Sequence, residues 1–327
     1  MPVSTDVQLR PLGVTGIRVS EIGFGTWAIG GDANGSMGYG PTDDEESLAA
    51  LADARALGCT LFDTSNLYGW GHAEALLGQA FAACRRDVVL ATKAGFAHQD
   101  GRQDFSPDAI RRSLDGSLRR LRTDHVDLLQ MHNPTREALE GNDRLFTTLE
   151  AMRHEGTIRA LGISAASPDE ALLYATRYHP QSLQVNFNLG DLRALHNGLF
   201  DACRARDIGV IVRSPLAAGF LTGQLGVSDA FAATDHRRRY DAKMRARWID
   251  AVQRLRPVFD DAPRATPAQN AIRFVLSFAA VSTVIPGMFR GADVREDLGA
   301  AGLPRLSASR REAVEAIYDQ VFYQGAA

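Results

Sequence analysis

Short apolar runs alternate with longer amphipathic segments along the chain. The apolar runs occupy residues 20–27, 59–65, 88–93, 125–132, 158–164, 182–188, 209–216 and 281–287. Such alternation is typical of βα units in a parallel sheet. Eight units favour closure, because a closed sheet exposes no edge strand and buries both faces of every strand. The pattern therefore predicts an α/β protein with a (β/α)8 TIM barrel, a parallel eight-stranded barrel formed by a single domain, residues 1–327.

The segment after the third run has the best-marked helical pattern. Ser106 can cap a helix, and Pro107 suits the first helical position. Apolar residues then fall on one face of this helix, at Ile110, Leu114, Leu118 and Leu121. We expect that face to pack on the strands.

Three further segments lie outside the alternation. Residues 9–19 predict an N-terminal hairpin that closes one barrel end, and residues 307–323 predict an extra C-terminal helix. The segment 219–260 is longer than a usual connection, which is typical of a lid or a binding loop. No GxGxxG motif follows the first strand, and this disfavours a Rossmann domain.

The composition narrows the expected partners and compartment. The 327 residues are 45% hydrophobic and 23% charged, with a net charge of −3, so neither nucleic acid nor an anionic membrane is an expected partner. The sequence has no signal-like segment and no apolar run of membrane-spanning length. Its three cysteines have neither disulfide-framework nor metal-ligand spacing. We expect a cytoplasmic protein without a bound metal, either a monomer or a homo-oligomer.

Four reactive side chains lie at or just beyond successive strand ends: Asp63, Tyr68, Lys93 and His132. Active sites in barrels of this class lie at the carboxyl ends of the strands, so we expect these residues to meet at one mouth. Asp63 and Lys93 would satisfy each other as a buried charge pair. A tyrosine has an ordinary pKa of ~10, and an adjacent ammonium is expected to lower the pKa of Tyr68 toward neutrality.

Motifs along nearly the whole chain resemble those of the aldo-keto reductase superfamily. They are GFGTW, FDTSNLYGWGHAEALLG, ATKAGF, MHNP, GIS, QVNFN, SPLAAGFLTG and VIPG, in this order. The resemblance implies that Asp63, Tyr68, Lys93 and His132 form the catalytic tetrad of an NAD(P)(H)-dependent carbonyl reductase or alcohol dehydrogenase. In such an enzyme the nicotinamide exchanges hydride with the carbonyl carbon, Tyr68 exchanges the proton on the oxygen, and His132 orients that oxygen.

The resemblance also assigns residues to a nicotinamide cofactor. Ser164 and Gln184 would hold the carboxamide, and Arg213 stands where many members place an aromatic ring against the nicotinamide. The loop after the seventh strand would cover the pyrophosphate with Ser214, Leu216, Gly219, Leu221 and Gly223. Further cofactor contacts are implied at Gly25, Thr26, Trp27 and Asp63.

The adenosine end departs most from the family pattern. Its assigned residues are Gly287, Phe289, Arg290, Asp293 and Asp297. Arg290 favours NADP(H), because a guanidinium pairs well with a 2′-phosphate. The Asp293 carboxylate would repel that phosphate and keeps NAD(H) open. We expect NADP(H) as the favoured cofactor and a small-molecule carbonyl or alcohol as the substrate.

Two other functions stay open, one of which depends on the lysine at a strand end. A Schiff-base aldolase would use Lys93 as its nucleophile, although pairing with Asp63 would keep that amine protonated. A redox sensor would bind a nicotinamide nucleotide without fast turnover.

The surroundings of the site allow weaker predictions. We expect three tryptophans to line the substrate pocket, Trp27 foremost, then Trp70 and Trp248. The run Arg237–Arg239 is expected to be solvated rather than a phosphate clamp or a lid latch. Histidines without partner spacing are assigned to the surface, namely His98, His154, His179, His196 and His236.

Overall fold

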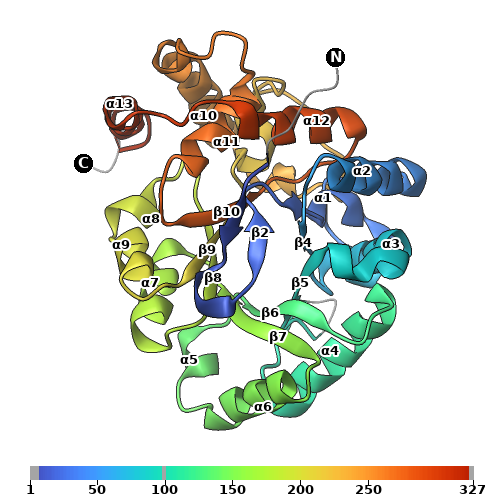
Figure 1. Ribbon diagram of the computed structural model, residues 1–327. Coiled ribbons are helices and arrows are strands. Elements are labelled where there is room, and N and C mark those ends of the chain that lie inside the picture. The colour runs from blue at the N-terminus through green and yellow to red at the C-terminus, as the bar shows by residue number, and fades with distance from the viewer. Residues whose placement is uncertain (1–6, 98–100, 324–327) are drawn as a thin grey trace.

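The strands close into a barrel surrounded by helices (Figure 1). The computed structural model describes residues 7–97 and 101–323. Its barrel strands are β3 (Phe24–Gly25), β4 (Leu61–Asp63), β5 (Val89–Ala94), β6 (Val126–His132), β7 (Ile158–Ser164), β8 (Ser182–Asn186), β9 (Gly209–Arg213) and β10 (Val281–Ile285). They follow one another as parallel neighbours in an eight-stranded sheet. Gly23 N donates to Val284 O and Gly25 N to Pro286 O, each at 2.8 Å, and these bonds join the first strand to the last. The predicted parallel barrel is confirmed.

The helices lie mainly around the outside of this barrel. They are α1 (Trp27–Gly30), α2 (Asp44–Ala56), α3 (His72–Phe81), α4 (Pro107–Leu121), α5 (Arg136–Leu139), α6 (Asp143–His154), α7 (Pro168–Arg177), α8 (Arg193–His196), α9 (Leu199–Arg204), α10 (Ala242–Leu255), α11 (Pro267–Leu276), α12 (Gly291–Gly299) and α13 (Ala308–Tyr318). The helix expected after Ser106 is α4, and the Ser106 hydroxyl accepts a hydrogen bond from the Ala109 N–H. The expected C-terminal helix is α13, which continues as the π-helical turn η9 (Asp319–Tyr323).

A hairpin of β1 (Leu9–Pro11) and β2 (Arg18–Ser20) closes the amino-terminal end of the barrel, as predicted. Leu12, Ile17 and Val19 of this hairpin pack with buried residues of the barrel interior, including Leu61 and Leu128. The connecting turn touches the ends of β7, β8 and β9, seen at the centre of Figure 1. Because apolar side chains plug this end, a site for polar chemistry is left to the opposite mouth.

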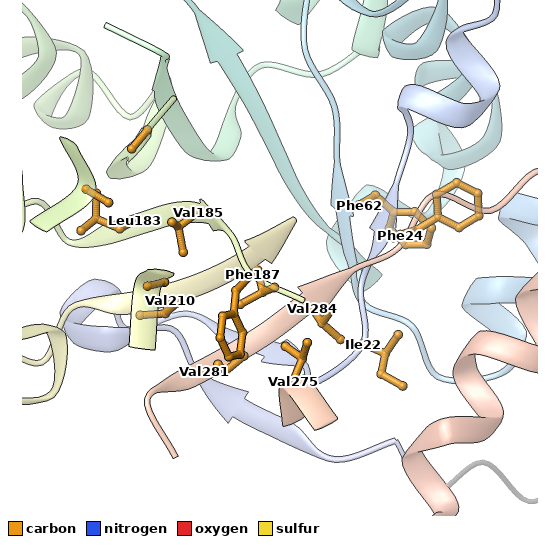
Figure 2. Packing of buried hydrophobic residues seen from close by; sticks show 14 of the residues in the cluster. Ile22, Phe24, Phe62, Leu183, Val185, Phe187, Val210, Val275, Val281 and Val284 are labelled. Carbon is orange, nitrogen blue, oxygen red and sulfur yellow. The ribbon is translucent and has the colours of Figure 1, made fainter. Parts of the chain in front are cut away.

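The alternation of side chains along each strand separates the core from the site. Phe62 of β4 points outward and packs near Phe24 of β3, with ring centroids 5.9 Å apart (Figure 2). Its neighbours Leu61 and Asp63 have the opposite orientation, because successive residues of a strand face opposite sides. Leu61 packs with the apolar hairpin residues at the amino-terminal end of the barrel, whereas Asp63 lies two residues nearer the carboxyl end of β4.

Two predicted elements differ in extent. The first strand covers only Phe24–Gly25 of the run 20–27, because Trp27 already begins α1. A Cβ on Gly25 would lie 2.8 Å from Ile285 O, so this close contact between β3 and β10 requires glycine. The long segment 219–260 is more ordered than a loop, since it contains α10 and the 3-10 helix η6 (His236–Arg239). No helix in residues 7–97 and 101–323 is both long enough and apolar enough to cross a membrane.

Candidate active site

The carboxyl ends of neighbouring strands bring the four reactive side chains together. Asp63 ends β4, His132 ends β6, and Lys93 is the second-last residue of β5. Tyr68 follows β4 in the 3-10 helix η3 (Tyr68–Gly71). The four residues were expected to meet at one mouth because they lie at or just beyond strand ends, and they do.

Lys93 is the centre of this group. Its Nζ donates to Asp63 Oδ1 in a short ion pair, to Tyr68 Oη at 3.0 Å and to Thr64 O at 2.9 Å. Lys93 is 0% exposed, and Tyr68 is 8% exposed. A buried ammonium is stable only when it is paired and its donors are satisfied, and these three acceptors meet that requirement.

The pKa of Tyr68 moves opposite to the prediction. Burial raises the pKa of this phenol and the Asp63 carboxylate raises it too, while the Lys93 ammonium lowers it, and the net direction is upward. The prediction was wrong because it counted the neighbouring ammonium and omitted the desolvation of the phenolate. At neutral pH, Tyr68 is therefore a protonated phenol.

The pKa of Lys93 is also raised. Burial lowers it, but the facing Asp63 carboxylate and Tyr68 raise it more. Lys93 is therefore an ammonium, which can stabilise a negative charge that forms on the Tyr68 oxygen.

Two glutamines hold the other oxygen of Asp63. Gln130 Nε2 donates to Asp63 Oδ2 at 2.9 Å, and Gln184 Nε2 donates to the same atom at 2.7 Å. The amide nitrogen of Gln184, expected to meet a carboxamide, is thus engaged by Asp63, and its Oε1 lies 3.5 Å from the Ser164 hydroxyl. Gln130 was not predicted, although its position two residues before His132 placed it on the same face of β6.

His132 is a buried, neutral imidazole. Burial lowers its pKa well below the ordinary range, and the charges of Lys93 and Arg213 lower it further. Its Nδ1 lies 3.1 Å from Ser65 Oγ, and the edge of its ring meets Phe96, with centroids 4.8 Å apart. Ser65 was not predicted, and only its place inside the DTSNLYG motif could have suggested a role.

Aromatic and guanidinium groups surround these side chains. Trp27 stacks on Tyr68 with ring centroids 5.5 Å apart, as expected for a residue that lines the site. Arg213, at the end of β9, is half-buried and donates through one nitrogen to Ala165 O at 3.1 Å. Trp248 lies instead in α10, against Phe220 and Tyr240.

Most residues predicted for the pyrophosphate and adenosine line one cavity of about 210 Å³. These are Ser214, Leu216, Gly219, Gly287, Phe289, Arg290, Asp293 and Asp297. Leu221 and Gly223 do not line this cavity. Leu221 is buried in the core, and both residues border a neighbouring pocket instead. Ser214, Ala217, Ala218 and Gly219 have positive φ angles of 55°, 45°, 58° and 93°. Such left-handed backbone turns N–H groups toward a common point and is typical of anion-binding loops.

The part of this cavity that was predicted to hold the adenosine contains three carboxyl groups beside Arg290, those of Asp293, Glu296 and Asp297. The Asp293 carboxylate accepts from Arg290 N at 3.1 Å and from Phe289 N at 3.3 Å, so it caps α12. It also lies 3.6 Å from the Arg290 guanidinium. Asp297 is 3% exposed, and burial together with Glu296 and Asp293 raises the pKa of its carboxyl well above the ordinary range.

Two residues of the Asp235–Arg239 segment were predicted wrongly. His236 is 6% exposed, because its backbone N–H and its Nδ1 both bond to Gly38 O at 2.9 Å. Arg237 is half-buried, pairs with Asp235 at 2.6 Å and lines the cavity. This segment forms bridges to residues 38 and 39, a long-range contact that sequence spacing does not reveal. Arg238 and Arg239 are exposed, as expected, and His98 lies outside the described residues.

The residues present fit a nucleotide cofactor. Thr26 Oγ1, Trp27 Nε1 and Asn133 Oδ1 are buried without a hydrogen-bond partner among the residues that the structure describes. They follow β3 and β6, at the mouth of the barrel. Buried polar atoms are normally paired, so unpaired atoms of this kind at the barrel mouth suit a bound polar group.

A family model, relatives and solved structures match this chain, and several of them are described as aldo-keto reductases. The family model described as "Aldo/keto reductase family" matches residues 21–319. The chain is 30% identical to the aldo-keto reductase yakc [NADP(+)] of Schizosaccharomyces pombe, covering 91% of this chain and 88% of the relative. It is 33% identical to the NADH-specific methylglyoxal reductase of Escherichia coli, covering 66% and 69%. Among solved structures, the holo form of aldo-keto reductase AKR11C1 from Bacillus halodurans superposes with a TM-score of 0.78 at 26% identity, covering 95% and 96%.

Proposed function

Because the chain belongs to the aldo/keto reductase family, we propose that it is an NAD(P)(H)-dependent oxidoreductase that interconverts a carbonyl compound and an alcohol, acting as a single domain. The observation that carries this proposal is the buried ammonium of Lys93, which bonds to Asp63 on one side and to the Tyr68 phenol on the other. This arrangement presents a protonated phenol whose conjugate base has a cation beside it, as a general acid requires.

Tyr68 is the proton donor in this proposal. When bound, the nicotinamide supplies or accepts the hydride. Tyr68 gives its proton to the carbonyl oxygen during reduction and takes it back during oxidation. The phenolate left behind is stabilised by Lys93, 3.0 Å away, and Asp63 keeps Lys93 charged and in place.

His132 orients the substrate oxygen. Its neutral imidazole donates one hydrogen bond without placing a full charge beside the reacting centre. The single proton of the Ser65 hydroxyl can go to Asn66 Oδ1, 3.3 Å away, or to His132 Nδ1, 3.1 Å away. When it goes to Nδ1, the ring proton lies on Nε2, and this is the form that the proposal requires. Phe96 and Trp27 supply apolar surface near Tyr68 and His132, which suits a small organic carbonyl.

The cofactor would be held along the cavity that begins at Ser214. The loop Ser214–Gly219 would bind the pyrophosphate through those of its N–H groups that are not bonded inside the loop, since Ala217 N already donates to Ser214 O and Gly219 N to Leu216 O. Ser164 would meet the carboxamide. Arg290 is the group that favours NADP(H) over NAD(H), because it can pair with a 2′-phosphate. Its ion pair with Asp293 opposes that preference, and the two relatives carry NADP(+) and NADH in their names.

The experiment for the function as a whole is a fluorescence titration with NADPH and NADH, followed by a panel of carbonyls and alcohols with the tighter cofactor. Saturable binding and turnover of at least one carbonyl support the proposal. Binding without turnover across the panel would favour a redox sensor.

A Schiff-base aldolase is the other enzyme class to test. An amine must lose its proton to attack a carbonyl, and the raised pKa of Lys93 opposes this. Borohydride trapping of a carbonyl substrate on Lys93 would support the aldolase and contradict the reductase.

A further inference from the structure

The charges around the barrel mouth do not cancel. Asp63 and Lys93 neutralise each other in their ion pair. His132 and Tyr68 are both uncharged at neutral pH, because burial lowers the pKa of the first and raises that of the second. Arg213 keeps its charge, since a guanidinium does not deprotonate in proteins. In the part of the chain that the structure describes, Arg213 has no carboxylate within ion-pair distance. Asp191, whose charge does act on it, is itself paired with Arg193 at 2.7 Å, so the mouth keeps a net positive charge.

Backbone carbonyls hold this charge over the mouth. Arg213 ends β9, and its Nη2 donates to Ala165 O at 3.1 Å and to Ala166 O at 3.4 Å, just beyond the end of β7. Since β8 lies between β7 and β9, the side chain reaches across the carboxyl end of β8. Both bonds use the same nitrogen, so Nε and Nη1 keep their donors for another group as far as residues 7–97 and 101–323 are concerned.

In the proposed reaction, the nicotinamide would lie near this charge. A carbonyl oxygen that bonds to Tyr68 and His132 puts its carbon at the same point of the mouth. Hydride transfer requires the reacting atoms to be in van der Waals contact, so the nicotinamide ring must lie against that carbon. Arg213 Nη2 bonds to Ala165 O, one residue beyond Ser164, and Ser164 lies beside His132 in the register of β6 and β7, so the guanidinium reaches the same mouth. Its charge also acts to lower the pKa of both Tyr68 and His132.

We propose that Arg213 discriminates between the two redox states of the cofactor, weakening the binding of the oxidised nicotinamide relative to the reduced one. This inference rests on the proposed function. The oxidised ring carries a positive charge and the reduced ring is neutral, so only the oxidised ring is repelled by the guanidinium. Two unit charges a few ångströms apart in a partly buried site change an affinity by about tenfold or more.

Thermodynamic linkage gives the sign of the consequence. If the oxidised form binds more weakly by some factor, the bound oxidised cofactor is a stronger oxidant than the free cofactor by the same factor. The equilibrium on the enzyme is then displaced toward carbonyl and reduced cofactor. Release of the oxidised cofactor after a reduction is also faster.

The test compares dissociation constants for the oxidised and reduced forms of one cofactor. Arg213→Gln removes the charge and retains donors, and Arg213→Lys is the matched variant that keeps the charge. Fluorescence titration gives the constant for the reduced form, and displacement of that form gives the constant for the oxidised form. We expect Arg213→Gln to lower the ratio of oxidised to reduced constants by about tenfold, and Arg213→Lys to preserve most of it.

The outcomes separate this inference from the proposed function. Failure of the unaltered protein to bind either form would contradict the function itself. Equal weakening of both forms in Arg213→Gln would show that Arg213 binds an anionic group common to both, and the inference would be wrong. If Arg213→Gln does not fold, Arg213→Met, which also removes the charge, is titrated in the same way and judged by the same two outcomes.

Discussion

The ammonium of Lys93 lies 3.0 Å from the hydroxyl of Tyr68, and both groups are buried. Burial raises the pKa of the phenol and so keeps it protonated at neutral pH. The neighbouring ammonium can stabilise the phenolate once the proton has been transferred. A donor of this kind keeps its proton until a substrate oxygen takes it.

The first prediction concerns the ion pair. Lys93→Met should lower kcat by about 10²-fold or more, because the phenolate loses its cation. It should also cost ~3–5 kcal/mol of stability, because Asp63 is left as an unpaired buried charge. Chemical denaturation and steady-state kinetics measure the two effects.

The double variant Lys93→Met with Asp63→Asn is the matched control for charge. It removes both charges, so it should recover part of the lost stability and none of the lost activity. Recovery of activity in the double variant would contradict the role of Lys93 as stabiliser of the phenolate.

Ser65 is predicted to fix the proton position on His132. Ser65→Ala removes the partner that lies 3.1 Å from Nδ1, so the imidazole should spend more time in the wrong tautomer. We expect a fall in kcat/KM of about tenfold, the value of one hydrogen bond of ordinary strength. Cofactor affinity should be unchanged, and Ser65→Thr, which keeps a hydroxyl, should retain more activity. A parallel loss of cofactor binding would indicate collapse of the local turn instead.

The preference between NADP(H) and NAD(H) is predicted to depend on Arg290. Arg290→Ala should weaken NADPH by about tenfold and leave NADH nearly unchanged, because only NADPH has the 2′-phosphate. Asp293→Asn should strengthen NADPH, since it removes a repelling charge while its amide oxygen can still cap α12. Titration of both variants with both cofactors gives the result. Equal effects on the two cofactors would place the 2′-position away from Arg290.

Asp297 gives a prediction for stability against pH. Its pKa is raised in the folded protein by burial and by Glu296 and Asp293, so the native state binds a proton that the unfolded chain releases. Stability should therefore fall as pH rises from the unfolded pKa of ~3.9 toward the folded pKa, by up to ~1.4 kcal/mol per pH unit.

Asp297→Asn should remove this dependence, because the amide has the shape of the protonated acid and does not titrate. Its melting temperature should exceed that of the unaltered protein at pH 8 and approach it at pH 4. Glu312→Gln changes an exposed carboxylate and serves as the control for net charge. Parallel pH profiles for Asp297→Asn and the unaltered protein would show that this carboxyl ionises normally.

The barrel and the meeting of its polar residues followed from the sequence because both depend on local periodicity. The alternation of Leu61, Phe62 and Asp63 fixes which side chain faces the interior once the strand is recognised. Parallel strands then gather their last inward residues at one mouth, which is why Lys93 and His132 were found.

Features that depend on contacts between distant segments were not predictable in this way. Gln130 meets Asp63 across the barrel interior, and its polarity alone gave no partner. His236 is buried because its segment pairs with residue 38, which is 198 positions away in the sequence. The pKa of Tyr68 is shifted upward mainly because the phenol is buried, and the degree of burial cannot be inferred from the charged residues near it in the sequence.

The central claim is that Tyr68 transfers the proton, and Tyr68→Phe tests it most directly. This change removes one hydroxyl and keeps the ring that stacks on Trp27. The measurement is kcat for a carbonyl that the unaltered protein reduces, together with the dissociation constant of the cofactor. The account predicts a fall in kcat of about 10²–10⁴-fold with cofactor affinity nearly unchanged. Reduction at the rate of the unaltered protein would contradict it.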